Sequence, residues 1–124
     1  MKKNKILIVD DNKALLDALR LLLKEEFEVI RTISGPTQLY GELEKGDLDV
    51  VLLDMNFKAG MNTGNEGLYW LREIKKKNPL VEVVMITAYG DAENYNTAMR
   101  LGADDFLTKP VEFNLLKEKL KAIQ

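Results

Sequence analysis

The sequence contains neither cysteine nor histidine. Without cysteine, the chain cannot form disulfide bonds or thiolate metal sites, which is consistent with a reducing cytosol. Without histidine, imidazole is unavailable as a metal ligand or as a general base. Any chemistry at this chain must therefore rely on carboxylates, hydroxyl groups and lysine.

Long apolar runs and an excess of positive charge are missing as well. No apolar stretch approaches the roughly 20 residues that a membrane-spanning helix needs. The apolar segment behind the basic start ends at Val9 and runs into Asp10 and Asp11, which is too short for a signal peptide. The net charge of −2 is unlike that of a nucleic-acid-binding surface. We therefore expect a cytoplasmic domain that contacts neither membranes nor nucleic acids directly.

What the sequence does contain is an alternation of short apolar runs with longer helical patterns. The apolar runs predict strands at 6–9, 28–31, 49–53, 82–86 and 105–107. Apolar residues at helical spacing predict helices at 13–24, 36–45, 66–78, 91–101 and 112–123. A βα unit repeated five times predicts one α/β domain, in which right-handed crossovers place helices on both faces of a parallel sheet.

Several side chains in these helices have a predicted environment. In the first two helices, we expect the core to receive Leu15, Leu19, Leu22, Leu23, Leu39, Tyr40 and Leu43. The run Lys75, Lys76 and Lys77 is expected to be a solvated helix end, because cations there suit the helix dipole. Gly102 is expected to end the fourth helix.

Polar side chains follow four of the five predicted strands. Asp10 and Asp11 follow the first strand, Asp54 the third, Thr87 the fourth, and Lys109 comes shortly after the fifth. In an open α/β sheet, ligands bind at the carboxyl ends of the strands. We therefore expect three carboxylates, a hydroxyl group and an ammonium group to meet at one edge of the sheet.

Three carboxylates at close quarters repel one another unless a cation lies among them. Oxygen ligands without sulfur or imidazole favour a hard ion, so we expect Mg²⁺, with Mn²⁺ as the substitute. Lys109 supplies a positive charge for a phosphoryl oxygen, and Thr87 supplies a hydrogen-bond donor. Peptide N–H groups near Asn56 and Ala88 complete the cradle. This set of groups around a carboxylate is typical of phosphoryl transfer.

Four segments carry a resemblance to a known family: 6–11 (ILIVDD), 53–56 (LDMN), 86–88 (ITA) and 107–110 (LTKP). In order and spacing, and over the whole chain, they resemble the receiver domains of bacterial response regulators. The resemblance implies a flavodoxin-like fold with strand order 2-1-3-4-5. It also implies that residues 1–124 form one receiver domain, which either stands alone or is excised from a longer regulator.

The resemblance implies a role for each of the acidic residues. Asp54 matches the aspartate that accepts the phosphoryl group. Asp11 and Asp54 match the carboxylates that bind the metal directly, and Asp10 matches an acidic partner that acts on it indirectly, often through water. Asn56 matches the residue whose backbone carbonyl binds the metal.

The remaining matches concern the phosphoryl group and the switch. Lys109 matches the phosphoryl-binding lysine, and Pro110 the proline that follows a cis peptide bond. Thr87 matches the switch hydroxyl, and Phe106 the switch aromatic, which turns inward behind it. The peptide N–H groups of Asn56 and Ala88 are expected to bind phosphoryl oxygens.

The function implied by the resemblance is signalling rather than enzymatic turnover of a separate substrate. A sensor histidine kinase or a phosphotransfer protein donates the phosphoryl group, and the domain later hydrolyses it. The face formed by the fourth helix, fifth strand and fifth helix then repacks. This change controls an output domain or a partner, with transcription regulation as the expected output and a homodimer as an expected consequence of phosphorylation.

The segment after Asp54 departs from the family pattern. Lys58 stands where the family commonly has proline, and the loop over 57–66 is roughly five residues longer than usual for a fold of this kind. As a hypothesis, Lys58 or Asn62 approaches the phosphoryl group. Tyr89, two residues after Thr87, either shields Asp54 from water or lies on the surface.

Three other functions fit parts of the pattern. A phosphatase of the haloacid-dehalogenase type needs a second acid two residues after its nucleophile, where this chain has Asn56, and it needs a cap domain. A flavin-binding carrier needs a Ser/Thr/Gly-rich loop after the first strand, where Asp10, Asp11 and Asn12 would repel the flavin phosphate. A pseudo-receiver usually loses an acidic or lysine position, and none is lost here.

Overall fold

The computed structural model describes residues 5–54, 65–87 and 92–122. The strands are β1 (Lys5–Val9), β2 (Val29–Ile33), β3 (Val50–Asp54), β4 (Glu82–Thr87) and β5 (Asp105–Thr108). The helices are α1 (Lys13–Leu23), the 3₁₀ turn η1 (Pro36–Gln38), α2 (Leu39–Glu44), α3 (Asn65–Lys77), α4 (Ala92–Arg100) and α5 (Phe113–Ala122). Within these described ranges, no helix is long and apolar enough to cross a bilayer.

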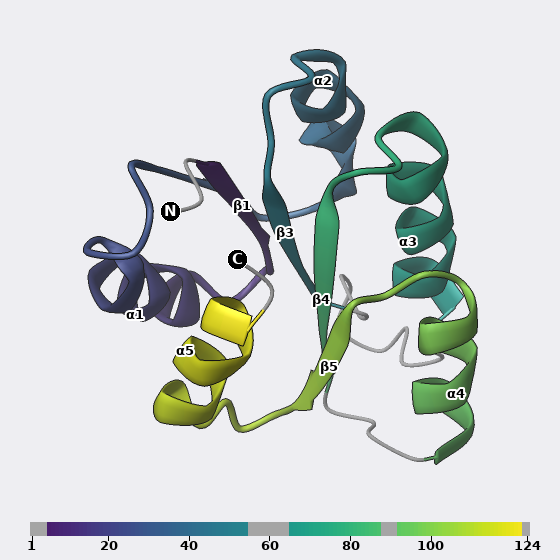
Figure 1. Cartoon of the computed structure of the whole chain (residues 1–124). Coiled ribbons are helices and arrows are strands. Elements are labelled where there is room, and N and C mark those ends of the chain that lie inside the picture. The colour runs from purple at the N-terminus through teal and green to yellow at the C-terminus, as the bar shows by residue number, and fades with distance from the viewer. Residues whose placement is uncertain (1–4, 55–64, 88–91, 123–124) are drawn as a thin grey trace.

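The five strands form one parallel sheet in the order β2-β1-β3-β4-β5, with α1 and α5 on one face and α2, α3 and α4 on the other (Figure 1). This confirms the predicted flavodoxin-like arrangement. The inner positions of the central strands, such as Val50 to Leu53, are apolar and buried because helices cover both faces of the sheet. In β1, for example, Ile6 and Ile8 pack toward α1 and α5, whereas Leu7 and Val9 pack toward α2, α3 and α4.

The chain turns sharply where β1 ends and α1 begins. The Asp10 N–H donates to Ile33 O at 3.2 Å, which extends the pairing with β2 by one residue. Asn12 then caps α1, because its side-chain oxygen accepts the N–H of Leu15 at 3.1 Å. The two aspartates are thereby held between a buried strand and the start of a helix.

Several element boundaries and core positions differ from the predictions. Pro36 starts a 3₁₀ turn, and the α-helix begins only at Leu39. Strand β2 begins at Val29 and extends to Ile33, beyond the predicted end. In α1, Leu16 is buried together with Leu19 and Leu23, whereas Leu15 and Leu22 are only partly buried. The apolar stripe of this leucine-rich helix is therefore rotated relative to the prediction.

The prediction that Lys75 belongs to a merely solvated helix end is wrong. Lys75 Nζ donates to Val81 O at 2.7 Å and pairs with Asp104 Oδ2 at 3.0 Å. The same carboxylate oxygen accepts the N–H of Val83 at 2.8 Å. Gly102 ends α4 as predicted, with a φ of 110° that disfavours other residues, and a Cβ added there would lie 3.4 Å from Lys75 Cγ.

The prediction that Tyr40 points into the core is also wrong, since its side chain is 43% exposed. Its ring meets the ring of Trp70 edge-on, with centroids 4.8 Å apart, and Tyr69 meets Trp70 at 5.1 Å. The Tyr40 hydroxyl donates to Glu73 Oε1 at 3.2 Å and lies 3.2 Å from the Tyr69 hydroxyl. A phenol needs such partners, and α3 offers them only at the surface.

We expect the Tyr40 phenol to titrate well above a free tyrosine. Its hydrogen bond with Tyr69, followed by burial and the charge of Glu73, raises the pKa of Tyr40 from 10.0 to about 12. Because the fold favours the neutral phenol, its contribution to stability is complete below pH 10 and is lost as the pH rises toward 12. Ultraviolet absorbance of tyrosinate measures the titration.

Tyr40→Phe should remove this high transition from the absorbance titration. Tyr95→Phe, which removes a phenol on α4 that is exposed to a similar degree, should leave the transition in place. Persistence of the transition at about pH 12 in Tyr40→Phe would show that another phenol produces it.

Candidate functional site

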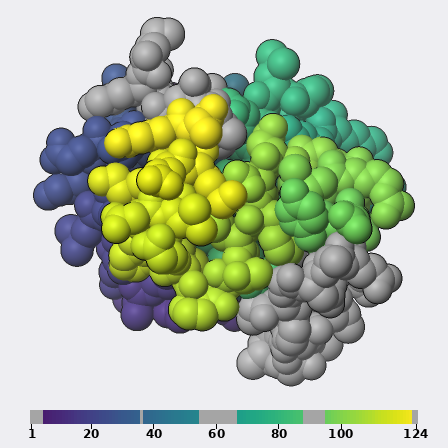
Figure 2. All heavy atoms as spheres, turned by 60° about the horizontal axis from the view of Figure 1, so that its bottom comes forward, coloured from purple at the N-terminus to yellow at the C-terminus, as the bar shows by residue number. Residues whose placement is uncertain are grey.

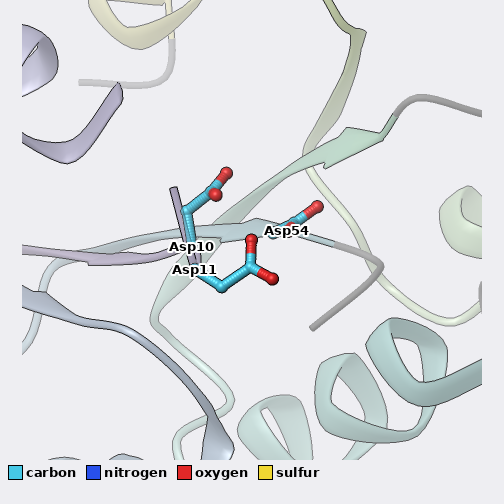
Figure 3. A group of neighbouring side chains, drawn as sticks. All are labelled: Asp10, Asp11 and Asp54. Atoms are coloured by element: carbon cyan, nitrogen blue, oxygen red, sulfur yellow. The ribbon is translucent and has the colours of Figure 1, made fainter. Parts of the chain in front are cut away.

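Three carboxylates gather where β1 and β3 end. One oxygen from each of Asp10, Asp11 and Asp54 lies within 4.8 Å of the others (Figure 3). Asp10 and Asp54 are only 2% and 3% exposed, whereas Asp11 is exposed. The sheet brings them together because Val9 and Leu53 are register partners, so the residues that follow them emerge side by side.

Both oxygens of Asp10 are engaged. Its Oδ1 accepts the N–H of Asn12 at 2.9 Å, and its Oδ2 lies 3.0 Å from Lys109 Nζ. The Asn12 side chain in turn caps α1, so the helix start fixes the orientation of the carboxylate. Asp10 therefore positions the lysine and has less freedom to react than its neighbours.

Lys109 reaches the carboxylates from the end of β5. Its Nζ lies 3.6 Å from Asp54 Oδ1, and its backbone N–H donates to Thr87 O at 2.7 Å. The peptide bond between Lys109 and Pro110 is cis. Burial alone would lower the pKa of Lys109, but its hydrogen bond with Asp10 and the charges of Asp10 and Asp54 together raise it. The ammonium group is therefore firmly charged.

Thr87 ends β4 and is completely buried. Asp54 pairs in register with Ile86, so Thr87 lies one position beyond the acidic residue on the neighbouring strand. Thr87 itself pairs with Thr108 on β5, and Met85 pairs with Phe106. Phe106 is 8% exposed and packs edge-on against Tyr95 of α4.

The predicted residues thus divide into two groups. The structure brings Asp10, Asp11, Asp54, Thr87 and Lys109 to one edge of the sheet. The other predicted positions in this region, which lie outside the described residues, are Asn56, Lys58, Asn62, Ala88 and Tyr89.

Sequence reasoning missed two residues that act beside this set. Asn12 orients Asp10, and its position three residues before Leu15 is a recognisable capping signal. Tyr95 contacts Phe106, but no motif in the sequence predicts that contact.

The arrangement has the charge and geometry of a metal site. Three carboxylates against one ammonium group leave two negative charges in excess. Oxygens on opposite sides of a Mg²⁺ ion are about 4.2 Å apart, given bonds of ~2.1 Å. The three carboxylate oxygens all lie within 4.8 Å of one another, so a single ion can contact all three after small side-chain movements. The residues present therefore fit a hard divalent cation bound by oxygen ligands.

Comparison with known proteins identifies the family. A family model of the response regulator receiver domain matches residues 6–121. The chain belongs to this family. This receiver domain is 43% identical to the N-terminal signal receiver domain of a two-component system response regulator from Bacteroides fragilis, with a TM-score of 0.84, covering 98% of this chain and 97% of that one.

Curated relatives of the receiver domain are longer proteins. It is 32% identical over 119 residues to the transcriptional regulatory protein CiaR of Streptococcus pneumoniae, covering 96% of this chain and 50% of the relative. It is 36% identical over 116 residues to a cyclic di-GMP phosphodiesterase of Thermotoga maritima, covering 93% of this chain and 29% of the relative. The receiver domain thus spans half or less of the length of these relatives.

Proposed function

We propose that this receiver domain accepts a phosphoryl group on Asp54 from phosphohistidine, with Mg²⁺ bound beside it. The observation that carries the proposal is the position of Asp54, a buried carboxylate 3.6 Å from Lys109 Nζ within a cluster of acids. Asp10 is less suitable because both its oxygens are engaged, and Asp11 is exposed rather than buried.

The chain's own residues would hold the ion and the phosphoryl group. Asp11 and Asp54 would bind Mg²⁺ directly, and Asp10 would act on it through water, while the carbonyl of Asn56 lies outside the described residues. A bound Mg²⁺ would neutralise charge on the carboxylates and on the phosphoryl oxygens. Mn²⁺ offers similar ligand preferences.

The transfer consists of one displacement at phosphorus. An oxygen of Asp54 attacks the phosphorus atom, a P–O bond forms, and the P–N bond to the donor imidazole breaks. Lys109 holds one phosphoryl oxygen through charge, and Thr87 donates to another once its hydroxyl reaches the site. In the later hydrolysis, water attacks phosphorus, the acyl phosphate bond breaks, and inorganic phosphate leaves the restored carboxylate.

A hollow beside the site supports docking of a donor protein. It measures about 280 Å³ and is lined by Asn12, Leu15, Lys109, Pro110, Val111 and Phe113. The hollow adjoins the reactive groups, because Lys109 belongs to both. We propose that a sensor histidine kinase or a phosphotransfer protein places its phosphohistidine here.

The proposed output is carried by another domain or by a partner. We propose that phosphorylation repacks the face made by α4, β5 and α5, and that this face acts on a fused output domain or on a second copy of the chain. A longer parent protein is supported by the greater length of the relatives, and transcription regulation by the similarity to the transcriptional regulatory protein CiaR. The net charge of −2 argues against direct DNA contact by this domain.

Intact mass after incubation with acetyl phosphate tests the proposal. We expect the wild type to gain the mass of one phosphoryl group in the presence of Mg²⁺ and none in the presence of a chelator. Asp54→Ala should gain nothing, whereas Asp17→Ala, which alters an exposed carboxylate of α1, should behave as the wild type does. An equal gain in Asp54→Ala would refute the assignment of the acceptor. No gain in the wild type, from acetyl phosphate or from a phosphorylated histidine kinase, would refute the proposed function.

A further inference from the structure

One aromatic ring stands between the switch residue Phe106 and the solvent. Phe106, in β5, is 8% exposed, and the ring of Tyr95 in α4 meets it edge-on with centroids 5.6 Å apart and planes at 82°. Tyr95 itself is 44% exposed. Figure 2 looks onto the surface that α4, in green, and α5, in yellow, share. Tyr95 therefore touches a buried core residue with one part of its ring and water with another.

The sheet register connects this pair of rings to the reactive edge. Thr87 pairs with Thr108, and Met85 pairs with Phe106, so Phe106 lies two positions from the partner of Thr87. Residues two apart on a strand share a face of the sheet. Met85 and Phe106 belong to the core beneath α3 and α4. A line of neighbouring positions thus runs from Thr87 across the sheet to α4.

We infer that Tyr95 is a positioning residue of the switch, which holds Phe106 in its buried place and transmits that placement to the surface of α4. The inference rests on the proposed phosphorylation of Asp54. The family resemblance implies that Phe106 is turned inward in the phosphorylated state, and we take the buried placement of Phe106 against Tyr95 as that inward placement. Loss of the contact makes the inward state harder to reach.

The size of the effect follows from the contact. An edge-on aromatic pair present in only one of two states shifts the equilibrium between them roughly 2- to 12-fold, in addition to the effect of the apolar area that it buries. A switch whose two states are close in free energy is sensitive to a factor of that size. Among the described residues, no hydrogen bond, ion pair or ring contact joins Tyr95 to the carboxylates. We therefore expect Tyr95 to affect the switch and not the phosphoryl transfer itself.

The position of Phe106 can be followed by ¹⁹F NMR of protein labelled with fluorophenylalanine. The chain has four phenylalanines, and Phe106→Leu assigns the relevant signal. Fluoroberyllate with Mg²⁺ serves as a mimic of the aspartyl phosphate. In the wild type, the Phe106 signal should move on addition of the mimic. In Tyr95→Ala, the ratio of inward to outward signal at the same mimic concentration should fall roughly 2- to 12-fold.

Three further variants separate positioning from stability. Tyr95→Phe keeps the ring and should restore the wild-type ratio, whereas Tyr95→Leu keeps apolar cover without an aromatic edge and should not. Tyr69→Ala is the matched control, because Tyr69 is 48% exposed and also meets one aromatic ring edge-on, at 5.1 Å, but on α3. It should switch as the wild type does. Circular dichroism checks that each variant is folded.

The outcomes distinguish this inference from the proposed function. All variants are also incubated with acetyl phosphate, and their intact masses are measured. A wild type that gains no phosphoryl group overturns the proposed function and the inference together. A normal mass gain with an unchanged Phe106 ratio in both Tyr95→Ala and Tyr95→Leu overturns the inference alone.

Discussion

Lys109→Met is expected to slow phosphorylation of Asp54 by acetyl phosphate about 10²- to 10³-fold, the loss typical for removal of one preorganised group that stabilises developing negative charge. Lys109 Nζ is 3.6 Å from Asp54 Oδ1, at the edge where the phosphoryl oxygens would lie. Methionine keeps much of the length of the side chain but carries no charge. The rate of mass gain at saturating Mg²⁺ measures the effect.

The same substitution should destabilise the fold by on the order of 3 kcal/mol when no divalent cation is present. Asp10 and Asp54 are nearly fully buried, and Lys109 is the cation that contacts both. The raised pKa of Lys109 shows that its burial, which acts in the opposite direction, is outweighed by the hydrogen bond and charge of Asp10 and by the charge of Asp54. Urea unfolding in a chelating buffer measures the loss.

Lys117→Met is the matched control for this experiment. Lys117 lies on α5 with a side chain 34% exposed, against 26% for Lys109, and it is 4.0 Å from Glu26. A pair at the surface contributes about 0.2–1 kcal/mol, and Lys117 and Glu26 are both partly exposed. Suppose that Lys109→Met lowered the free energy of unfolding by no more than Lys117→Met does in the chelating buffer. The fold would then not depend on Lys109 to offset the charge of the acid cluster.

The alternation of strands and helices and most of the site were predictable because both depend on local patterns, whereas the strand order 2-1-3-4-5 was implied by the family resemblance. Strands covered on both faces must be apolar throughout, as Val50 to Leu53 are, and this pattern separates them from the amphipathic helices. Once the sheet is parallel, its carboxyl edge collects whatever follows each strand. Asp10, Asp54 and Lys109 are therefore placed together by topology, before any side-chain contact is considered.

What escaped prediction depends on contacts between distant parts of the chain. The partner of Lys75 is Asp104, 29 residues away, and a lysine run alone gives no sign of it. Tyr40 is apolar enough to fit a core pattern, but its hydroxyl finds partners only at the surface of α3. The contact of Tyr95 with Phe106 joins α4 to β5 and likewise leaves no periodic signal.

Mg²⁺ is expected to stabilise the wild type, because only the folded chain assembles the acid cluster that we propose as its binding site. At a concentration 100 times its Kd, the ion should raise the free energy of unfolding by about 2.7 kcal/mol. For a domain of this size, the midpoint of thermal unfolding should rise by on the order of 10 °C. A Mg²⁺ titration followed by thermal unfolding measures both the affinity and the gain.

Adding Mg²⁺ should reverse the order of stability of Asp11→Asn and the wild type. In a chelating buffer, the variant should be at least as stable as the wild type, because it removes one of three mutually repelling charges. In saturating Mg²⁺ it should be less stable, because the ion loses a charged ligand. Asp17→Asn, on the exposed surface of α1, should show the same gain from Mg²⁺ as the wild type.

This reversal separates a metal site from a chance gathering of acids. Simple screening by added salt would reduce the repulsion between carboxylates in the wild type, but it would not make Asp11→Asn less stable than the wild type. A specific ion does so, since its binding free energy depends on the ligand that was removed. If Asp11→Asn were at least as stable as the wild type at every Mg²⁺ concentration, Asp11 would not be a metal ligand.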